Sequence, residues 1–442
     1  MFLRLIFPQN FHKFLSPNLS FWLLLALVIR FFLMAFTIHP DFFFIHMFPN
    51  LLVSHGVTNV YKIFEDYLYA GNSIYYSPPV MYFFSAVQFI ASPINIGFSQ
   101  LMDKAYAIDT TYINTDPTIY FQPVTRSTYL NFFLMKFPYL LFEVALLAIL
   151  LRLSKKWHEA RKIFFISLFN PIVLYGTYMF GQFDIIPTTL LMLGIYLILS
   201  GKPAFGMLVI GIAATFKNFA LILILPIALS VGANLREKLK LSLYGFLPFV
   251  ISYLIVLVQA PSQAIYMIIP KAYIEKVQLN PSVYSTISKF VRYITLILNY
   301  GVILALANFL KIDKTTKILG LSTIALLALF TFSPIVLFHY LTIVIPLLLL
   351  FFIQKKWFIA VFSIFIISIA IFKNWTRIQQ LGLFAPLDNR FFTETPATSE
   401  IIDRIFPYTY ISSTFYVTFF LISIFLILVS YKEIIFQARQ KS

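Results

Sequence analysis

The chain has 442 residues, of which 60% are hydrophobic and only 11% are charged, and its mean hydropathy is +0.86. So little charge cannot cover the surface of a soluble protein of this length, and the lack of cysteine excludes disulfides, thiolate metal sites and cysteine nucleophiles. The net charge is +16, but the basic residues gather in short loops between apolar runs. That distribution is typical of the cytoplasmic loops of membrane proteins, so we do not expect nucleic acid as a partner.

Apolar runs of about 18 residues or more recur along the chain, and each is a candidate transmembrane helix. Because lipid offers no partner to an unpaired backbone group, such segments must be helical. The sequence therefore predicts an all-α polytopic membrane protein in a single integral membrane domain, 1–442, with a bundle of about 11–13 transmembrane helices.

The first helix is expected at 20–38. Residues 1–19 carry Arg4 and Lys13 but no acid, which places the N-terminus in the cytoplasm. Arg30 lies within this helix, where a charge is costly in lipid, so it should face the bundle interior or a polar cavity. The following segment, 39–77, is then an extracytoplasmic loop, and we interpret it as a catalytic loop.

This loop carries three of the 17 acids of the chain. Asp41 stands just clear of the first helix, where a carboxylate can act as a general base or remain a solvated loop acid. Glu65 and Asp66 form a second acidic spot, which suits either a divalent metal or plain solvent exposure, so the metal is unknown. Tyr76 belongs to a dense group of tyrosines that fits a sugar ring or an interfacial belt.

The region 78–130 can be threaded in two ways. A helix begins at Pro78-Pro79 and reaches about residue 96, and the next apolar run, 130–151, ends in a basic cytoplasmic cluster. The helix that starts at Pro78 and the run 130–151 cannot both cross the membrane inward in succession. Either 78–101 is a re-entrant hairpin broken at Ser92-Pro93, or the orientation assigned to one of the helices is wrong. The hairpin is the preferred reading.

After residue 150 every basic cluster falls on the cytoplasmic side of a regular alternation. The core helices occupy 78–260, and the C-terminal helices occupy 261–442 with outer loops at 260–285 and 374–409. The later helices are expected at 163–180, 184–200, 203–216, 218–231, 241–259, 286–309, 318–333, 341–353, 357–373 and 411–430.

A second polar stretch, Phe180 to Asp184, includes Gln182 and follows one of these helices. Lys217 is expected at the same depth as Asp184, which indicates either a structural ion pair or a pocket for an anionic group, since lysine binds phosphate well. His339 precedes a later helix, where it suits an interfacial position or a substrate contact equally.

Several of these stretches, in this order, resemble the GT-C superfamily of membrane glycosyltransferases, and most closely its mannosyltransferase-like branch. The ordered set spans residues 20–350. The elements are Arg30 with His39-Pro40-Asp41, Tyr76-Ser77-Pro78-Pro79, Lys136-Phe137-Pro138-Tyr139 with Glu143, Leu168 to Pro171, Gly181 to Asp184, Gly211 with Lys217 and Pro226, and His339-Tyr340 with Pro346. Asp41 stands alone until Glu65-Asp66, and Glu143 stands where Asp is commoner in the family.

The resemblance implies transfer of a hexose, with mannose as the first expectation, from a polyprenyl-phosphate donor to a lipid-linked or cell-envelope acceptor. Transfer would invert the anomeric centre on the extracytoplasmic face of the cell membrane, without nucleotide or redox cofactor. Asp41 would deprotonate the acceptor, and Lys217 or Arg30 would stabilise the departing phosphate. Asp184 would orient Lys217 or the sugar, and Gln182 and His339 would contact the donor.

A transporter or lipid flippase is the alternative reading. It would show inverted internal repeats and broken helices near the midplane of the membrane. No convincing repeat is visible in the sequence, and the acids are expected at the outer edge of the membrane. A structural scaffold would not require the ordered polar motifs.

Overall fold

The computed structural model describes residues 17–37, 39–62, 76–107, 126–154, 156–261, 264, 283–333, 338–373 and 408–440. These residues are helical almost throughout, and none of them lies in a strand. The fold class predicted from the hydropathy is therefore confirmed: this is an all-α polytopic membrane protein.

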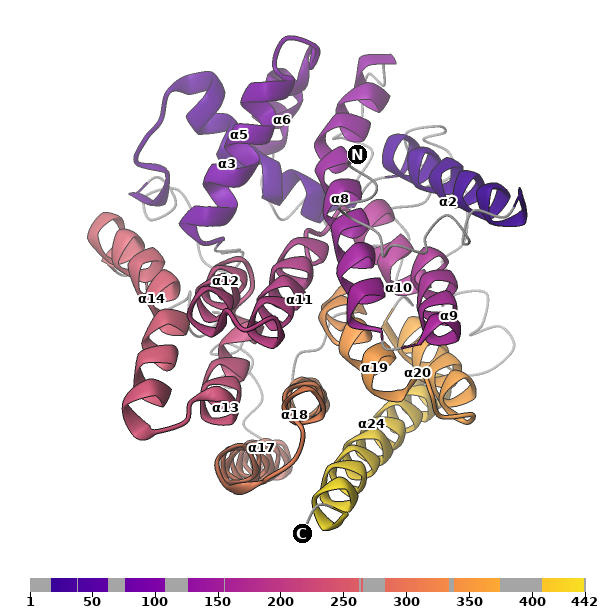
Figure 1. The fold of residues 1–442 in the computed structure, drawn as a ribbon. Coiled ribbons are helices and arrows are strands. Elements are labelled where there is room, and N and C mark those ends of the chain that lie inside the picture. Colours follow the sequence, from indigo (N-terminus) through magenta and orange to yellow (C-terminus); the bar gives the residue numbers. More distant parts are fainter. Residues whose placement is uncertain are drawn as a thin grey trace.

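The first half of the chain is arranged around α8, with α2 on one side and the group α3, α5 and α6 on another (Figure 1). Its elements are α2 (Pro17–Phe36), α3 (Pro40–His55), α5 (Pro78–Ala91), α6 (Phe98–Ala107), α8 (Arg126–Leu153), α9 (Trp157–Leu168), α10 (Pro171–Val173), the π-helix η3 (Leu174–Met179), α11 (Ile185–Leu199) and α12 (Pro203–Phe216).

The second half wraps around α18, which packs on α13, α17, α19 and α24. Its elements are the 3₁₀ turn η4 (Asn218–Ala220), α13 (Leu221–Val231), α14 (Leu235–Gln259), α17 (Val283–Phe309), α18 (Lys314–Phe332), the 3₁₀ helix η5 (Phe338–Ile343), α19 (Ile345–Phe352), α20 (Phe358–Lys373) and α24 (Tyr408–Arg439).

Six helices among the described residues are long and apolar enough to cross a membrane, or seven if the bent pair α2–α3 is one span. Five further apolar helices have only 10–17 residues, among them α5, α11 and α12. The expected count of about 11–13 treated each apolar run as a full span. Hydropathy cannot separate a short buried helix from a crossing, because both are equally apolar.

The expectation of a loop over 39–77 is wrong for its first part, because residues 40–55 form α3. Local signals explain the helix. Pro40 occupies its first turn, where a missing N–H costs nothing, and the side chain of His39 caps it by accepting the N–H of Asp41. Gly56 ends the helix in the left-handed conformation, with φ of 66°. Residues 63–75, with Glu65 and Asp66, lie outside the described residues.

The break predicted at Ser92-Pro93 is present: α5 ends at Ala91, and α6 begins at Phe98. Both helices pack against α3 (Figure 1). A second break lies at Asn170-Pro171, between α9 and α10. The Asn170 side chain caps the new start by accepting the N–H groups of Ile172 and Val173. The π-helix that follows is a form often found at functional sites.

Close glycine contacts fix α11 against α12. A Cβ on Gly194 would lie 2.8 Å from the carbonyl oxygen of Gly206, and a Cβ on Gly206 would lie 2.6 Å from that of Gly194. Small residues allow two membrane helices to approach this closely. Because the two helices are joined by the short turn at Ser200–Lys202, the start of α11 and the end of α12 lie at the same end of the pair. Asp184 and Lys217 stand at those two positions.

Candidate active site

Polar side chains from five segments meet at one place in the bundle. They come from the start of α3, the residues just before α5, the turn between η3 and α11, the end of α12, and η5. We call this group the polar cluster; its members are His39, Asp41, Tyr76, Gln182, Asp184, Lys217 and His339.

Asp41 has a neighbour at each carboxylate oxygen. The amide of Gln182 donates to its Oδ2 at 2.5 Å, and Nδ1 of His39 lies 3.3 Å from its Oδ1. Because the backbone N–H of Asp41 donates to this same Nδ1, the donor of the His39 ring is Nε2, and the approach of Nδ1 to Oδ1 is a contact without a hydrogen bond. His39 is in turn stacked on Phe180, with ring centroids 3.4 Å apart. Asp41 keeps 23% of its side chain exposed, so an incoming group can reach its carboxylate.

Asp184 and Lys217 form the second half of the polar cluster. Their Oδ1 and Nζ atoms lie 3.7 Å apart, which is an ion pair without a direct hydrogen bond. The ammonium lies over the rings of Phe183 and Tyr340, at 4.8 Å and 5.1 Å from their centroids. Nε2 of His339 lies 3.9 Å from the other oxygen of Asp184.

Burial sets the protonation states here. It raises the pKa of Asp184 to about 6, while Lys217 opposes the rise and Asp41 adds to it. Burial, with the nearby Lys217, holds the pKa of His339 well below its usual range, so its imidazole is neutral. Burial and the charge of Asp41 keep the pKa of Tyr76 well above its usual range. The cluster therefore offers neutral donors beside charged groups.

Three buried polar atoms of this cluster have no hydrogen-bond partner among the described residues: His39 Nε2, Gln182 Oε1 and Asp184 Oδ2. Buried polar atoms are paired in the great majority of cases, and each orphan costs about 1–3 kcal/mol. One donor and two acceptors left open in a single cluster indicate a site for a ligand that can both donate and accept.

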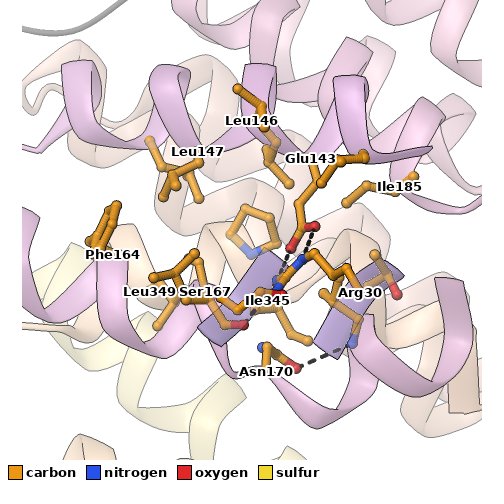
Figure 2. Close-up of a pocket in the computed structure, with 18 of the residues that line it drawn as sticks. Arg30, Glu143, Leu146, Leu147, Phe164, Ser167, Asn170, Ile185, Ile345 and Leu349 are labelled. Atoms are coloured by element: carbon orange, nitrogen blue, oxygen red, sulfur yellow. Dashed lines mark hydrogen bonds and ion pairs between the residues drawn. The ribbon is translucent and has the colours of Figure 1, made fainter. Parts of the chain in front are cut away.

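Arg30 lies elsewhere. Its guanidinium donates to both carboxylate oxygens of Glu143, at 2.6 Å and 2.5 Å, and to the carbonyl oxygens of Ala26 and Leu168. The hydroxyl of Tyr178 donates to the same carboxylate. Four of the five guanidinium N–H groups of Arg30 are thus taken up by protein groups, and Arg30 and Glu143 face each other beside a cavity (Figure 2). The contacts that join the polar cluster involve neither residue.

Beside this ion pair lies an apolar cavity of about 340 Å³ between α2, α8, α9 and α19 (Figure 2). Aliphatic side chains form most of its wall, and its polar groups are Arg30, Glu143, Asn170, Ser167 and Thr342. The cavity adjoins the polar cluster along the chain. Its lining residue Ile185 directly follows Asp184, and Thr342 belongs to the same 3₁₀ helix as His339.

No group of three or more His, Cys, Asp or Glu side chains that could hold a metal occurs among the described residues. Glu65 and Asp66, the acids considered for a metal, lie outside those residues, so the metal expectation stays a prediction.

Sequence reasoning missed two members of the site. His39 went unnoticed as a partner of Asp41, although a polar residue followed by Pro is a recognisable helix start. Phe180, which joins His39 to His339 by ring contacts at 3.4 Å and 5.2 Å, carries no signal in a chain with 52 phenylalanines.

Comparison with known proteins adds no assignment: no protein-family model and no curated protein matches the chain.

Proposed function

We propose that the chain is an integral membrane glycosyltransferase. It moves a hexose, with mannose as the first candidate, from a polyprenyl-phosphate donor to a lipid-linked or cell-envelope acceptor. The transfer inverts the anomeric centre and takes place on the extracytoplasmic face of the membrane. The N-terminus of the chain lies in the cytoplasm. One observation carries this proposal: a partly exposed carboxylate oriented by an amide, Asp41 with Gln182, shares a cluster with the Asp184–Lys217 pair, and the residue after Asp184, Ile185, lines an apolar cavity.

Asp41 acts as the general base. It takes the proton of the acceptor hydroxyl, whose oxygen forms a bond to the sugar C1 while the bond from C1 to the phosphate oxygen breaks. The proton ends on Asp41, and the bonding electrons leave with the lipid phosphate. Gln182 holds one carboxylate oxygen at 2.5 Å, so the base is fixed before the substrate arrives.

Lys217 stabilises the charge that grows on the phosphate. Its nearest carboxylate oxygen lies at 3.7 Å, too far to occupy an N–H group, so its donors are available to a phosphate oxygen. The rings of Phe183 and Tyr340 confine the ammonium, and the Lys217 side chain as a whole is 15% exposed. A fixed positive group in a site of low dielectric favours this kind of charge development.

The open atoms of the cluster suit a sugar. Hydroxyl groups both donate and accept, so they match the acceptors Asp184 Oδ2 and Gln182 Oε1 as well as the donor His39 Nε2. The rings of Tyr76, Phe183 and Tyr340 stand among these groups and offer faces for a pyranose ring. The apolar cavity beside Ile185 and Thr342 has the chemistry that the first part of a polyprenyl chain requires.

The direct test is transfer of radiolabelled mannose from polyprenyl-phosphate mannose to a lipid extract of the host by purified protein in detergent. Glucose on the same carrier is the second donor, and each assay is run with and without EDTA. Labelled lipid product supports the proposal, and loss of product with EDTA would assign a metal role to test at Glu65 and Asp66. No product with any carrier-linked hexose and native acceptor lipids would contradict it.

A transporter or flippase is the second candidate, because two spans are interrupted. The pair α2–α3 bends by 69°, and the span from His158 to Met179 is broken at Asn170-Pro171. Interrupted helices often surround transported substrates. Reconstituted vesicles separate the two functions: movement of carrier lipid between leaflets without formation of a new glycosidic bond would favour this reading.

A further inference from the structure

Lys136 is a fully buried lysine that forms no ion pair with an acid among the described residues. Its exposed fraction is 0%, and no carboxylate among the described residues lies within 4 Å of its Nζ. Nζ instead donates to two backbone carbonyl oxygens, those of Thr37 at 2.5 Å and Tyr178 at 2.8 Å. The ring of Phe42 faces it at 5.9 Å. A lysine buried in this way is costly, and such residues in membrane proteins usually have a function.

The two carbonyl groups belong to the ends of different helices. Thr37 follows the last residue of α2, and Tyr178 lies in the last turn of η3. Such carbonyls lack partners within their own helix, and they form the negative end of its dipole. Lys136 therefore joins two helix ends that are 141 positions apart in the chain. The hydroxyl of Thr37 shares its single proton between the carbonyl of Leu33 at 2.5 Å and that of Tyr178 at 3.2 Å, so its contribution to the junction is secondary.

Each of these two helix ends lies shortly before one partner of the hydrogen bond between Asp41 and Gln182. Asp41 lies four residues after Thr37, and Gln182 lies four residues after Tyr178. The stem of Lys136 also packs against the second segment, since a Cβ on Gly181 would meet its Cε at 3.6 Å. Three residues along α8, the hydroxyl of Tyr139 donates to the carbonyl of Gly181 at 3.0 Å. Thus α8 holds the segment 178–182 at two points.

We infer that Lys136 is a positioning residue: by clamping the carbonyls of Thr37 and Tyr178 it sets the contact between Asp41 and Gln182. It touches neither of their polar side-chain atoms, so it acts through the two backbone segments. The inference rests on the proposed function only for its kinetic consequence. The clamp itself is a structural claim and can be tested whether or not the protein transfers sugar.

The test compares Lys136→Met with a matched control, Lys317→Met. Methionine keeps the stem of Lys136 and removes its donors. Lys317 is also buried, at 7% exposure, but lies at the start of α18, away from the polar cluster. Hydrogen exchange in detergent is followed for segments 37–42 and 178–183, with α18 and α24 as internal references. We expect exchange about tenfold faster in the two segments of Lys136→Met, and unchanged exchange there in Lys317→Met.

Tyr139→Phe is the milder variant in case Lys136→Met does not fold. It removes only the hydrogen bond to Gly181, and we expect a smaller acceleration confined to 178–183. Unchanged exchange in both segments, or an equal acceleration in α18 and α24, would overturn the clamp.

Turnover is the second readout, measured with polyprenyl-phosphate mannose. Lys136→Met should lower kcat about ten- to hundredfold and leave the KM for the donor within about threefold, because the base is displaced while the phosphate contact at Lys217 remains. The double variant Lys136→Met/Gln182→Ala should be no slower than the poorer single variant. Additive losses would overturn the positioning role. Absence of turnover in the wild type would contradict the proposed function and leave the exchange result standing.

Discussion

The amide of Gln182 and the carboxylate of Asp41 are joined by a 2.5 Å hydrogen bond across 141 positions of sequence. This contact holds the carboxylate in the first turn of α3 against the turn between η3 and α11. We predict that Gln182→Ala lowers turnover about ten- to hundredfold, because a hydrogen bond to a charged group contributes about 1.5–3 kcal/mol. Initial rates at saturating donor measure this loss.

Gln88→Ala is the control for Gln182→Ala. Gln88 is equally buried and donates to the carbonyl of His46 at 2.8 Å, but it belongs to the packing of α3 against α5. It should lower thermal stability and leave kcat within about twofold. Equal kinetic losses in both variants would mean that Gln182 acts through folding alone.

The raised pKa of Asp184 predicts how stability depends on pH. Its pKa is about 6 in the folded protein against 3.8 for an ordinary aspartate, so the folded state holds this proton more tightly than the unfolded state. Stability should therefore fall as pH rises from about 4 to about 6 and level off above, by about 3 kcal/mol in total. Thermal unfolding is measured for the wild type and Asp184→Asn between pH 4 and 8, and the difference between their stabilities at each pH gives the contribution of Asp184. If stability depended on pH in the same way in both proteins, the raised pKa of Asp184 would be contradicted.

Lys217→Met should raise the KM for an anionic donor at least tenfold, because the cluster loses the cation that the proposed mechanism assigns to the phosphate. It should also destabilise the fold, since Asp184 then remains buried without its partner. The double variant Lys217→Met/Asp184→Asn separates the two effects. We expect it to regain stability and to keep the raised KM; recovery of donor affinity would show that Lys217 is a structural partner only.

Arg30 is predicted to stabilise the fold, in contrast to the phosphate role suggested by resemblance. It is 2% exposed and donates to Glu143 and two carbonyl groups. Arg30→Met should cost about 3–5 kcal/mol, and adding Glu143→Met should restore much of it. Lys355→Met, at the half-buried pair with Glu433 near the surface, should cost less, about 1 kcal/mol or below. An Arg30→Met protein with wild-type stability and no donor binding would reverse this view.

Much of the fold could be predicted from hydropathy and local signals. The break at Ser92-Pro93 was predicted, because proline interrupts helical hydrogen bonding. The same signal at Asn170-Pro171 lies within 163–180, which was expected as one helix and is divided there in the structure. The helix α3 was not foreseen, since its His and Asp residues read as a polar loop; its start at His39-Pro40 and its end at Gly56 were nevertheless in the sequence. The described residues contain fewer full-length spans than the 11–13 expected, for a physical reason: α11 and α12 are as apolar as a span but are only 15 and 14 residues long.

The candidate site was predictable in part. Asp184 and Lys217 were expected at one depth from the alternation of helices, and the structure places them 3.7 Å apart. The contact partners of each side chain could not be predicted from the sequence. Arg30 and Glu143 looked like site residues in the same way as Asp41, and only tertiary contact shows that they bind each other. The link from His39 through Phe180 to His339 depends on ring packing between distant segments, which has no local signature.

The measurement that tests the central claim most directly is sugar transfer by Asp41→Asn beside the wild type, with binding of polyprenyl-phosphate mannose measured on the same preparations. Asparagine keeps the shape of the side chain and the fold but cannot accept the acceptor proton. We predict at least a hundredfold loss of transfer, with donor affinity within about threefold of the wild type. Transfer at the wild-type rate in a variant that binds donor normally would contradict Asp41 as the base, and with it the mechanism proposed here.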